Sequence, residues 1–137
     1  MAAFGNTTRN ELIKFILQDI DPSWANAANL YVSFHTANPG FGGSQTTSEC
    51  AFGSYARATV ARSAVGFSES ADTGANAAAV QAPECTSGSE TVTHVAIGTA
   101  LSGAGQIIAT AALNSSRNVS TGIQLQFNVG ALTLQVT

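Results

Sequence analysis

The two histidines are the side chains in this sequence that most readily suggest chemistry. His35 and His94 are the only histidines, and both lie within strand-like segments. Imidazole nitrogens bind metals and transfer protons, but a metal site needs about four convergent ligands. No carboxylate stands at a spacing that would complete such a set. We therefore expect both histidines to form hydrogen bonds at strand ends, with no metal and no cofactor.

The carboxylates give no sign of a catalytic pair. Hydrolysis of a polysaccharide requires two carboxyl groups held at a fixed separation around the sugar bond. Nothing in the sequence fixes any pair in that way, and the nucleophile-elbow and phosphate-loop patterns are absent. We expect a protein that binds rather than an enzyme. Five carboxylates fall in expected loops or at strand ends, where solvated surface is usual: Glu49, Glu69, Asp72, Glu84 and Glu90.

Two cysteines, Cys50 and Cys85, are too few for the disulfide scaffold of a small secreted domain. One interpretation is a pair of isolated thiols near strand ends. The other is a bridge that forms once the protein leaves a reducing compartment. The sequence leaves both interpretations open.

The charge content excludes several classes of partner. Only 9% of the 137 residues are charged, the net charge is −3, and the five cations are scattered. Nucleic-acid binding depends on clustered cations, so we expect no direct contact with DNA or RNA. No stretch of about 20 apolar residues is present, and no signal-peptide pattern opens the chain, so we expect no membrane contact and synthesis in a cytoplasm.

The elements that would position these side chains are mostly strands. Leu30, Val32 and Phe34 share one face of an extended segment, and a turn signal at Asn38-Pro39-Gly40 follows. Short strands separated by Gly, Ser and Asn are typical of an antiparallel sandwich. We predict an all-β, jelly-roll-like β-sandwich, with an immunoglobulin-like sandwich as the alternative. The expected strands span 29–36, 54–61, 63–68, 76–81, 91–98, 105–113, 121–128 and 131–136.

One short helix precedes the strands. Thr8 and Glu11 have the spacing of a capping box, and Pro22 follows the last apolar residue of the pattern. The sequence thus predicts an N-terminal arm, 1–8, and a single β-sandwich domain, 9–137, that opens with a helix over 9–20. An isolated helix of about 11 residues is marginal. It should therefore cover one end of its own β-domain or dock on a neighbouring subunit. Its apolar residues recur at helical spacing: Leu12, Ile13, Ile16, Leu17 and Ile20.

Five segments resemble, in order, motifs of small virion structural proteins of tailed bacteriophages. The first, Leu30 to Gly40, resembles the pattern Leu-Tyr-Val-x-Leu-His-Thr-x-x-Pro-Gly, with Phe34 in place of the second leucine. Together the five segments cover roughly residues 8 to 137. The other four are Gly53-Ser54-Tyr55-Ala56-Arg57, Asn76-Ala77-Ala78-Ala79, Thr91 to Gly98, and Gly130-Ala131-Leu132-Thr133-Leu134.

The resemblance implies a component of the virion, made in the host bacterial cytoplasm. Our first interpretation is a capsid decoration, or cement, protein on the capsid exterior, bound to the major capsid protein and to itself as a homotrimer by analogy with other decoration proteins. The alternative is a minor tail or tail-fibre component that contacts a receptor, a glycan or other tail proteins. A lectin-like carbohydrate binder is a third interpretation, and it would need clustered aromatic side chains.

Aromatic side chains are the candidate interface residues, because aromatic residues anchor interfaces preferentially. Phe4 lies in the expected arm, and Trp24 lies between the helix and the first strand. Phe41, Phe52 and Tyr55 lie in or beside the long Gly-rich loop that follows that strand, and they form the one local aromatic cluster. The sequence offers no catalytic, cofactor-binding or metal-binding residues to set beside these five.

Overall fold

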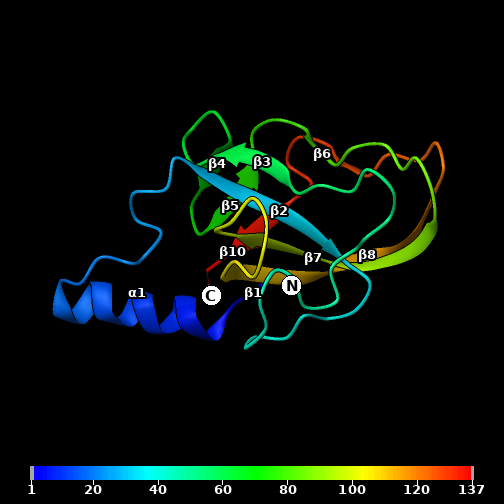
Figure 1. Ribbon diagram of the computed structural model, residues 1–137. Coiled ribbons are helices and arrows are strands. Elements are labelled where there is room, and N and C mark those ends of the chain that lie inside the picture. The colour runs from blue at the N-terminus through cyan, green and yellow to red at the C-terminus, as the bar shows by residue number, and fades with distance from the viewer. Residues whose placement is uncertain (1, 137) are drawn as a thin grey trace.

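The computed structural model describes residues 2–136 and is built mainly of antiparallel strands (Figure 1). It confirms the prediction of an all-β sandwich with one N-terminal helix. The strands are distributed over sheets of five, three and two, whereas a jelly roll has eight strands in two sheets. The elements are β1 (Ala3–Phe4), α1 (Asn6–Gln18), β2 (Asn29–His35), β3 (Ala58–Ala61), β4 (Phe67–Ser70), β5 (Thr73–Asn76), β6 (Val80–Gln81), β7 (Ser89–Gly98), β8 (Ile107–Ser120), β9 (Gln126–Phe127) and β10 (Thr133–Gln135).

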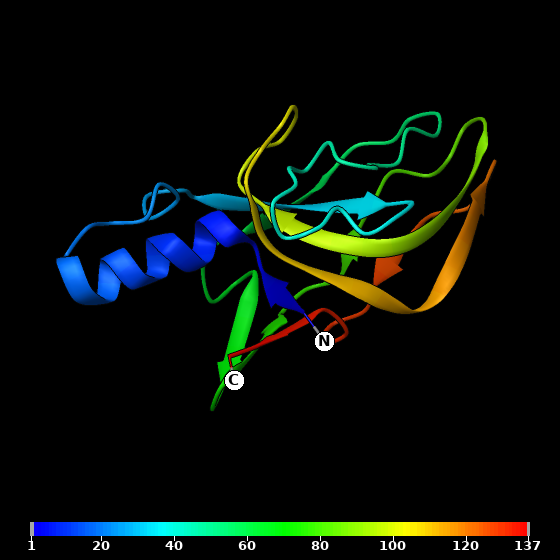
Figure 2. The same ribbon diagram turned by 90° about the horizontal axis from the view of Figure 1, so that it is seen from below.

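The largest sheet has the strand order β1-β8-β7-β2-β3 and is antiparallel throughout. Its longest strands, β7 and β8, form a hairpin that curves strongly (Figure 2). A register shift between Val92 and His94 lies within this hairpin, and irregularities of this kind bend strands. In β2 the register places Phe34 opposite Val95 and His35 opposite His94.

The hydrophobic core lies between this sheet and the two small ones, ordered β10-β5-β4 and β6-β9. Val32 and Phe34 point into it, as their alternation predicts, and the ring of Phe34 stacks on Phe127 of β9 at a centroid distance of 5.9 Å. The opposite face of β2 is buried as well, which the one-sided pattern did not predict. Segment 36–57 covers it and contributes buried side chains of its own, including Cys50 and Phe52.

Several predicted strands have different bounds because side chains end them. Asn76 closes β5: its Nδ2 donates to the carbonyls of Ala78 and Asn128, and its Oδ1 accepts from the N–H of Leu132. The predicted strand 76–81 is therefore divided between β5 and β6. The predicted strand 54–61 begins at Ala58, because the residues before it belong to the loop described below.

The predicted capping box is wrong. Helix α1 begins at Asn6, its N-cap is Gly5, and no side chain caps it. The hydroxyl of Thr8 instead donates to the carbonyl of Ile107, a residue 99 positions away. Glu11 likewise accepts long-range hydrogen bonds, from Gln106 and Trp24. Thr8 and Glu11 therefore bond to residues distant in the sequence instead of capping the helix.

The predicted arm is also part of the domain in the described residues. Ala3 and Phe4 pair with β8 as strand β1, and the N–H of Gly5 donates to the carbonyl of Ile108. The arm prediction missed this pairing because two residues carry too little alternation to indicate a strand. Within residues 2–136, no helix has the length and apolar character needed to cross a bilayer.

The structure leaves Cys50 and Cys85 as free thiols, both buried. Burial, with a smaller effect of the nearby Glu90 carboxylate, raises the pKa of Cys50 to about 12. The thiol of Cys85 donates to the carbonyl of Ser87. Both groups therefore behave as small core residues rather than as nucleophiles.

Replacing Gly5 tests how tightly α1 is joined to the sheet. A Cβ at this position would collide with the backbone carbonyl oxygen of Ile107. We expect Gly5→Ala to lower the free energy of unfolding by about 1–3 kcal/mol, measured by urea denaturation, because the helix start must move. Gly42→Ala is the matched control, since the nearest atom to a Cβ there is 3.7 Å away. Equal stabilities of the two variants would contradict this account.

Candidate functional site

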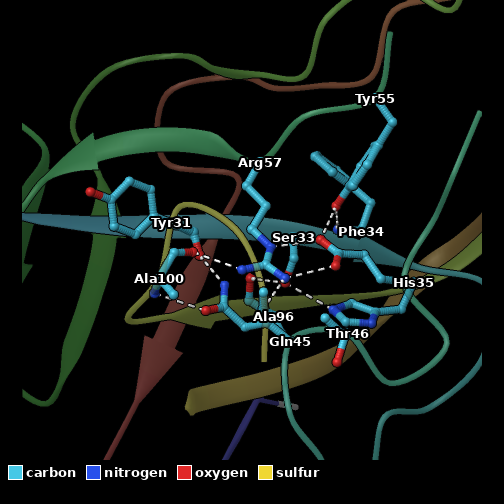
Figure 3. Close-up of polar contacts among 12 residues, drawn as sticks. Tyr31, Ser33, Phe34, His35, Gln45, Thr46, Tyr55, Arg57, Ala96 and Ala100 are labelled. Atoms are coloured by element: carbon cyan, nitrogen blue, oxygen red, sulfur yellow. Dashed lines mark hydrogen bonds and ion pairs between the residues drawn. The ribbon is translucent and has the colours of Figure 1, made fainter. Parts of the chain in front are cut away.

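A buried ion pair links Glu49, in the middle of the loop between β2 and β3, to Arg57 at the end of that loop. The Arg57 guanidinium, labelled in Figure 3, donates to both carboxylate oxygens of Glu49, at 2.7 Å each. Its remaining N–H groups donate to the carbonyls of Ala100 and Gly103, at 2.9 and 2.7 Å. This fork geometry is the one that arginine makes best with a carboxylate. The pair therefore ties segment 49–57 to the turn that connects β7 and β8.

Tyr55 extends the same cluster toward β2. Its hydroxyl donates to Glu49 Oε1 at 2.8 Å and accepts from the N–H of Phe34 at 3.1 Å. Burial raises the pKa of the Tyr55 phenol far above its ordinary value, and the Glu49 carboxylate raises it further. Tyr55 is therefore a neutral hydrogen-bonding group that fastens the loop to the strand.

Gln45 fastens the middle of the loop and is completely buried. Its Nε2 donates to the carbonyl of Tyr31, and its Oε1 accepts from the N–H of Ala100 at 3.0 Å. Gly98 and Gly105 leave the space for it, since a Cβ at either position would collide with the Gln45 side chain. The amide thus bridges β2 and the β7–β8 turn.

Ser33 and His35 form a pair that resembles catalytic machinery. The Ser33 Oγ lies 2.9 Å from His35 Nε2, and His35 Nδ1 lies 2.9 Å from the carbonyl oxygen of Thr47. Since a carbonyl only accepts, Nδ1 carries the proton and Nε2 accepts from the serine hydroxyl. Both side chains are fully buried, so the Ser33 hydroxyl is closed to a substrate. Their hydrogen bonds hold the 36–57 loop against strand β2.

The two histidines lie directly opposite one another on β2 and β7. Both ring nitrogens of His35 are engaged with Ser33 and Thr47, which leaves no free lone pair for a metal. His94 Nδ1 lies 2.8 Å from the Thr93 hydroxyl. Among the described residues, no group of three or more His, Cys, Asp or Glu side chains could hold a metal ion.

Glu90, which we expected to be a solvated surface residue, also holds the loop. Glu90 Oε2 accepts from the N–H groups of Ala51 and Phe52, at 2.8 and 3.0 Å. Together with Glu49, it supplies the acceptors for a segment that has little regular structure of its own. We call this set of side chains, Ser33, His35, Gln45, Glu49, Tyr55, Arg57 and Glu90, the loop-anchoring network.

The five candidate interface residues are not brought together. Phe52 is 4% exposed and belongs to the core, while Phe4, Trp24 and Tyr55 are partly buried against it. Phe41 is 47% exposed, with the Arg9 guanidinium over its ring. The cluster that a carbohydrate platform would need is therefore absent from this loop, because the rings of Phe52 and Tyr55 pack edge to face inside the protein.

An exposed surface on α1 carries none of the five candidate interface residues. Figure 2 shows the helix leaving the sheets near β1 and extending away from them. Its side that faces the domain carries Thr8 and Glu11, and Glu11 accepts from Ser23, Trp24 and Gln106. The opposite side is an apolar stripe, with exposed fractions of 55% for Ile13, 73% for Ile16, 76% for Leu17 and 50% for Ile20. The periodicity of these residues was visible in the sequence, and it predicted a face that covers the β-domain or docks on a neighbouring subunit.

This fold and its internally satisfied polar groups define a small, mostly β domain. The family model described as "Podophage GP4 fiber I protein gp80" matches residues 3–135, so the chain belongs to that family. It is a bacteriophage virion structural protein, as the resemblance in its sequence implied. A search of curated proteins found no match.

Breaking the ion pair from one side should be costly. Arg57→Met leaves the Glu49 carboxylate without its partner in a largely buried position, so we expect a loss of about 3–5 kcal/mol in urea denaturation. Replacing both residues by Met should restore part of that loss, because no unpaired charge remains. Arg117→Met, at an exposed position on β8, is the control and should change stability by less than about 0.5 kcal/mol. A double variant less stable than Arg57→Met would contradict this reasoning.

Acid should destabilise the fold through His35. Burial lowers the pKa of His35 below its ordinary value of 6.5, so the unfolded chain takes up a proton at a higher pH than the native one. The stability that the neutral His35 ring contributes is therefore fully present above pH 6.5. It is lost as the pH falls toward the pKa of His35 in the folded protein. We expect the unfolding free energy to drop between pH 7.5 and 5.5, and His35→Gln to reduce that drop. Equal drops in the natural protein and in His35→Gln would exclude His35 as the cause.

Proposed function

We propose that the chain is a non-enzymatic structural subunit of a phage fibre. The observation that carries this proposal is the family match over residues 3–135, because the printed description of that family names a podophage fibre protein. It favours the fibre interpretation over the capsid-decoration interpretation that the sequence first suggested.

The geometry supports a role in binding rather than in chemistry. The side chains most capable of acid–base or nucleophilic work, Ser33, His35 and Glu49, are engaged within the loop-anchoring network. This network holds the 36–57 loop rigidly against the sheet, which suits a domain that presents fixed surfaces. The stripe on α1 offers apolar contact area, and large exposed apolar patches mark interaction sites.

The proposed partners follow from the fibre role. We expect the chain to contact copies of itself and other virion proteins, with a host receptor or glycan met by exposed loops. We expect no contact with nucleic acid, since the five cations are scattered and three of them are used within the protein: Arg57 in the ion pair, Arg9 on Phe41 and Arg62 on Trp24.

Capsid decoration is the second candidate. The observation that favours it is the low charge content of 9%, which suits contacts with the major capsid protein that are insensitive to salt. Many identical weak contacts would then add through multivalency. This candidate places the chain on the capsid exterior, whereas the fibre proposal places it at the tail.

Copy number in purified virions separates the two. Quantitative mass spectrometry against the major capsid protein should give a ratio of a few per cent for a fibre subunit, because a particle carries few fibres. Gold-labelled antibody to the chain should mark the tail in electron micrographs. A ratio near one, with label spread over the head, would overturn the fibre proposal and establish decoration.

A further inference from the structure

The fold contains an apolar groove that its own residues leave unfilled. The groove has a volume of about 230 Å³ and lies between the ends of β2, β7 and β8 on one side and the small sheet of β4, β5 and β10 on the other. A cavity of about 150 Å³ with apolar walls already accepts a benzene ring. This groove can therefore take aliphatic side chains. Its apolar walls are Leu30, Phe67, Ile97, Ile108, Leu132 and Leu134.

The apolar stripe on α1 is the matching convex feature. Ile13, Ile16 and Leu17 lie on one side of the helix, and Ile20 lies beyond its end, after the C-cap residue Asp19. This is the spacing with which an amphipathic helix lays its apolar face into a groove. Within the described residues, the stripe faces away from the side of α1 that contacts its own domain through Thr8 and Glu11.

Charge agrees with this pairing. Lys14, the chain's one lysine, adjoins the stripe at Ile13 and is exposed. Glu69 lines the groove and is exposed as well. A helix seated in the groove can therefore place its cation beside a carboxylate, and complementary charges of this kind fix the register of an interface.

We propose that α1 of one copy docks in the apolar groove of a second copy of this chain. Each copy then offers a stripe to one neighbour and a groove to another, so the contact is used twice per chain. A head-to-tail contact of this type produces a closed ring when its rotation permits.

This inference rests on the proposed structural role only for what the contact is used for. The contact itself can be tested on the purified chain. Sedimentation equilibrium over a wide range of concentration should give a multiple of the 13.9 kDa chain mass. Leu17→Glu on the stripe and Leu134→Glu in the groove should each give a monomer. Val65→Glu is the matched control: Val65 is as exposed as Leu17 but lies outside both surfaces, so this variant should keep the wild-type mass.

Circular dichroism must show native strand content in every variant, which the exposure of Leu17 favours. Charge exchange then tests the register without removing apolar area. Lys14→Glu and Glu69→Lys should each weaken association several-fold, and the double variant should restore it. A monomeric wild type, a Leu134→Glu variant with unchanged mass, or a double variant as weak as the singles would overturn the proposal. The copy-number measurement is unaffected by any of these results.

Discussion

The ion pair between Glu49 and Arg57 is the constraint on which the rest of the fold depends. Backbone bridging places Glu49 beside His35 at the end of β2, and Arg57 directly precedes β3. The pair therefore fixes the second half of the loop that joins these neighbouring strands. Only with the loop in place is the second face of β2 buried, because Gln45 then donates to the backbone carbonyl of Tyr31 and the carbonyl of Thr47 accepts from the His35 ring.

The network explains why polar residues can occupy a buried face without cost to the fold. No buried side-chain nitrogen or oxygen among the described residues lacks a hydrogen-bond partner. A network that is satisfied throughout specifies one arrangement, because any displaced member leaves a costly unpaired group. The polar side of β2 therefore fixes one specific arrangement of strand and loop, while the opposite side of β2 supplies apolar burial.

Sequence reasoning succeeded where the pattern was local. The alternation of Leu30, Val32 and Phe34 predicted a strand with one apolar face, and the fold class followed from the repetition of such segments. It failed where partners are remote. Thr8 and Glu11 have the spacing of a local cap, but they bond to residues 99 and 95 positions away.

The surface of α1 shows the same limit in another form. Periodicity identified its apolar stripe, but periodicity reports only that a face avoids water and not what covers it. The interface residues were likewise chosen by type, and Phe52 lies in the core because the loop that carries it folds inward. Which aromatic ring remains outside depends on the loop-anchoring network, whose members are spread from Ser33 to Glu90.

The two buried thiols make this domain convenient for site-specific labelling. Maleimide reagents attack exposed thiolates, and Cys50 and Cys85 are enclosed in the core with the Cys50 proton held to about pH 12. A single cysteine introduced on the surface would therefore carry a fluorophore or a gold cluster without prior removal of the natural ones. Because the core encloses both natural thiols, a label on an introduced cysteine can locate the chain within an assembled particle.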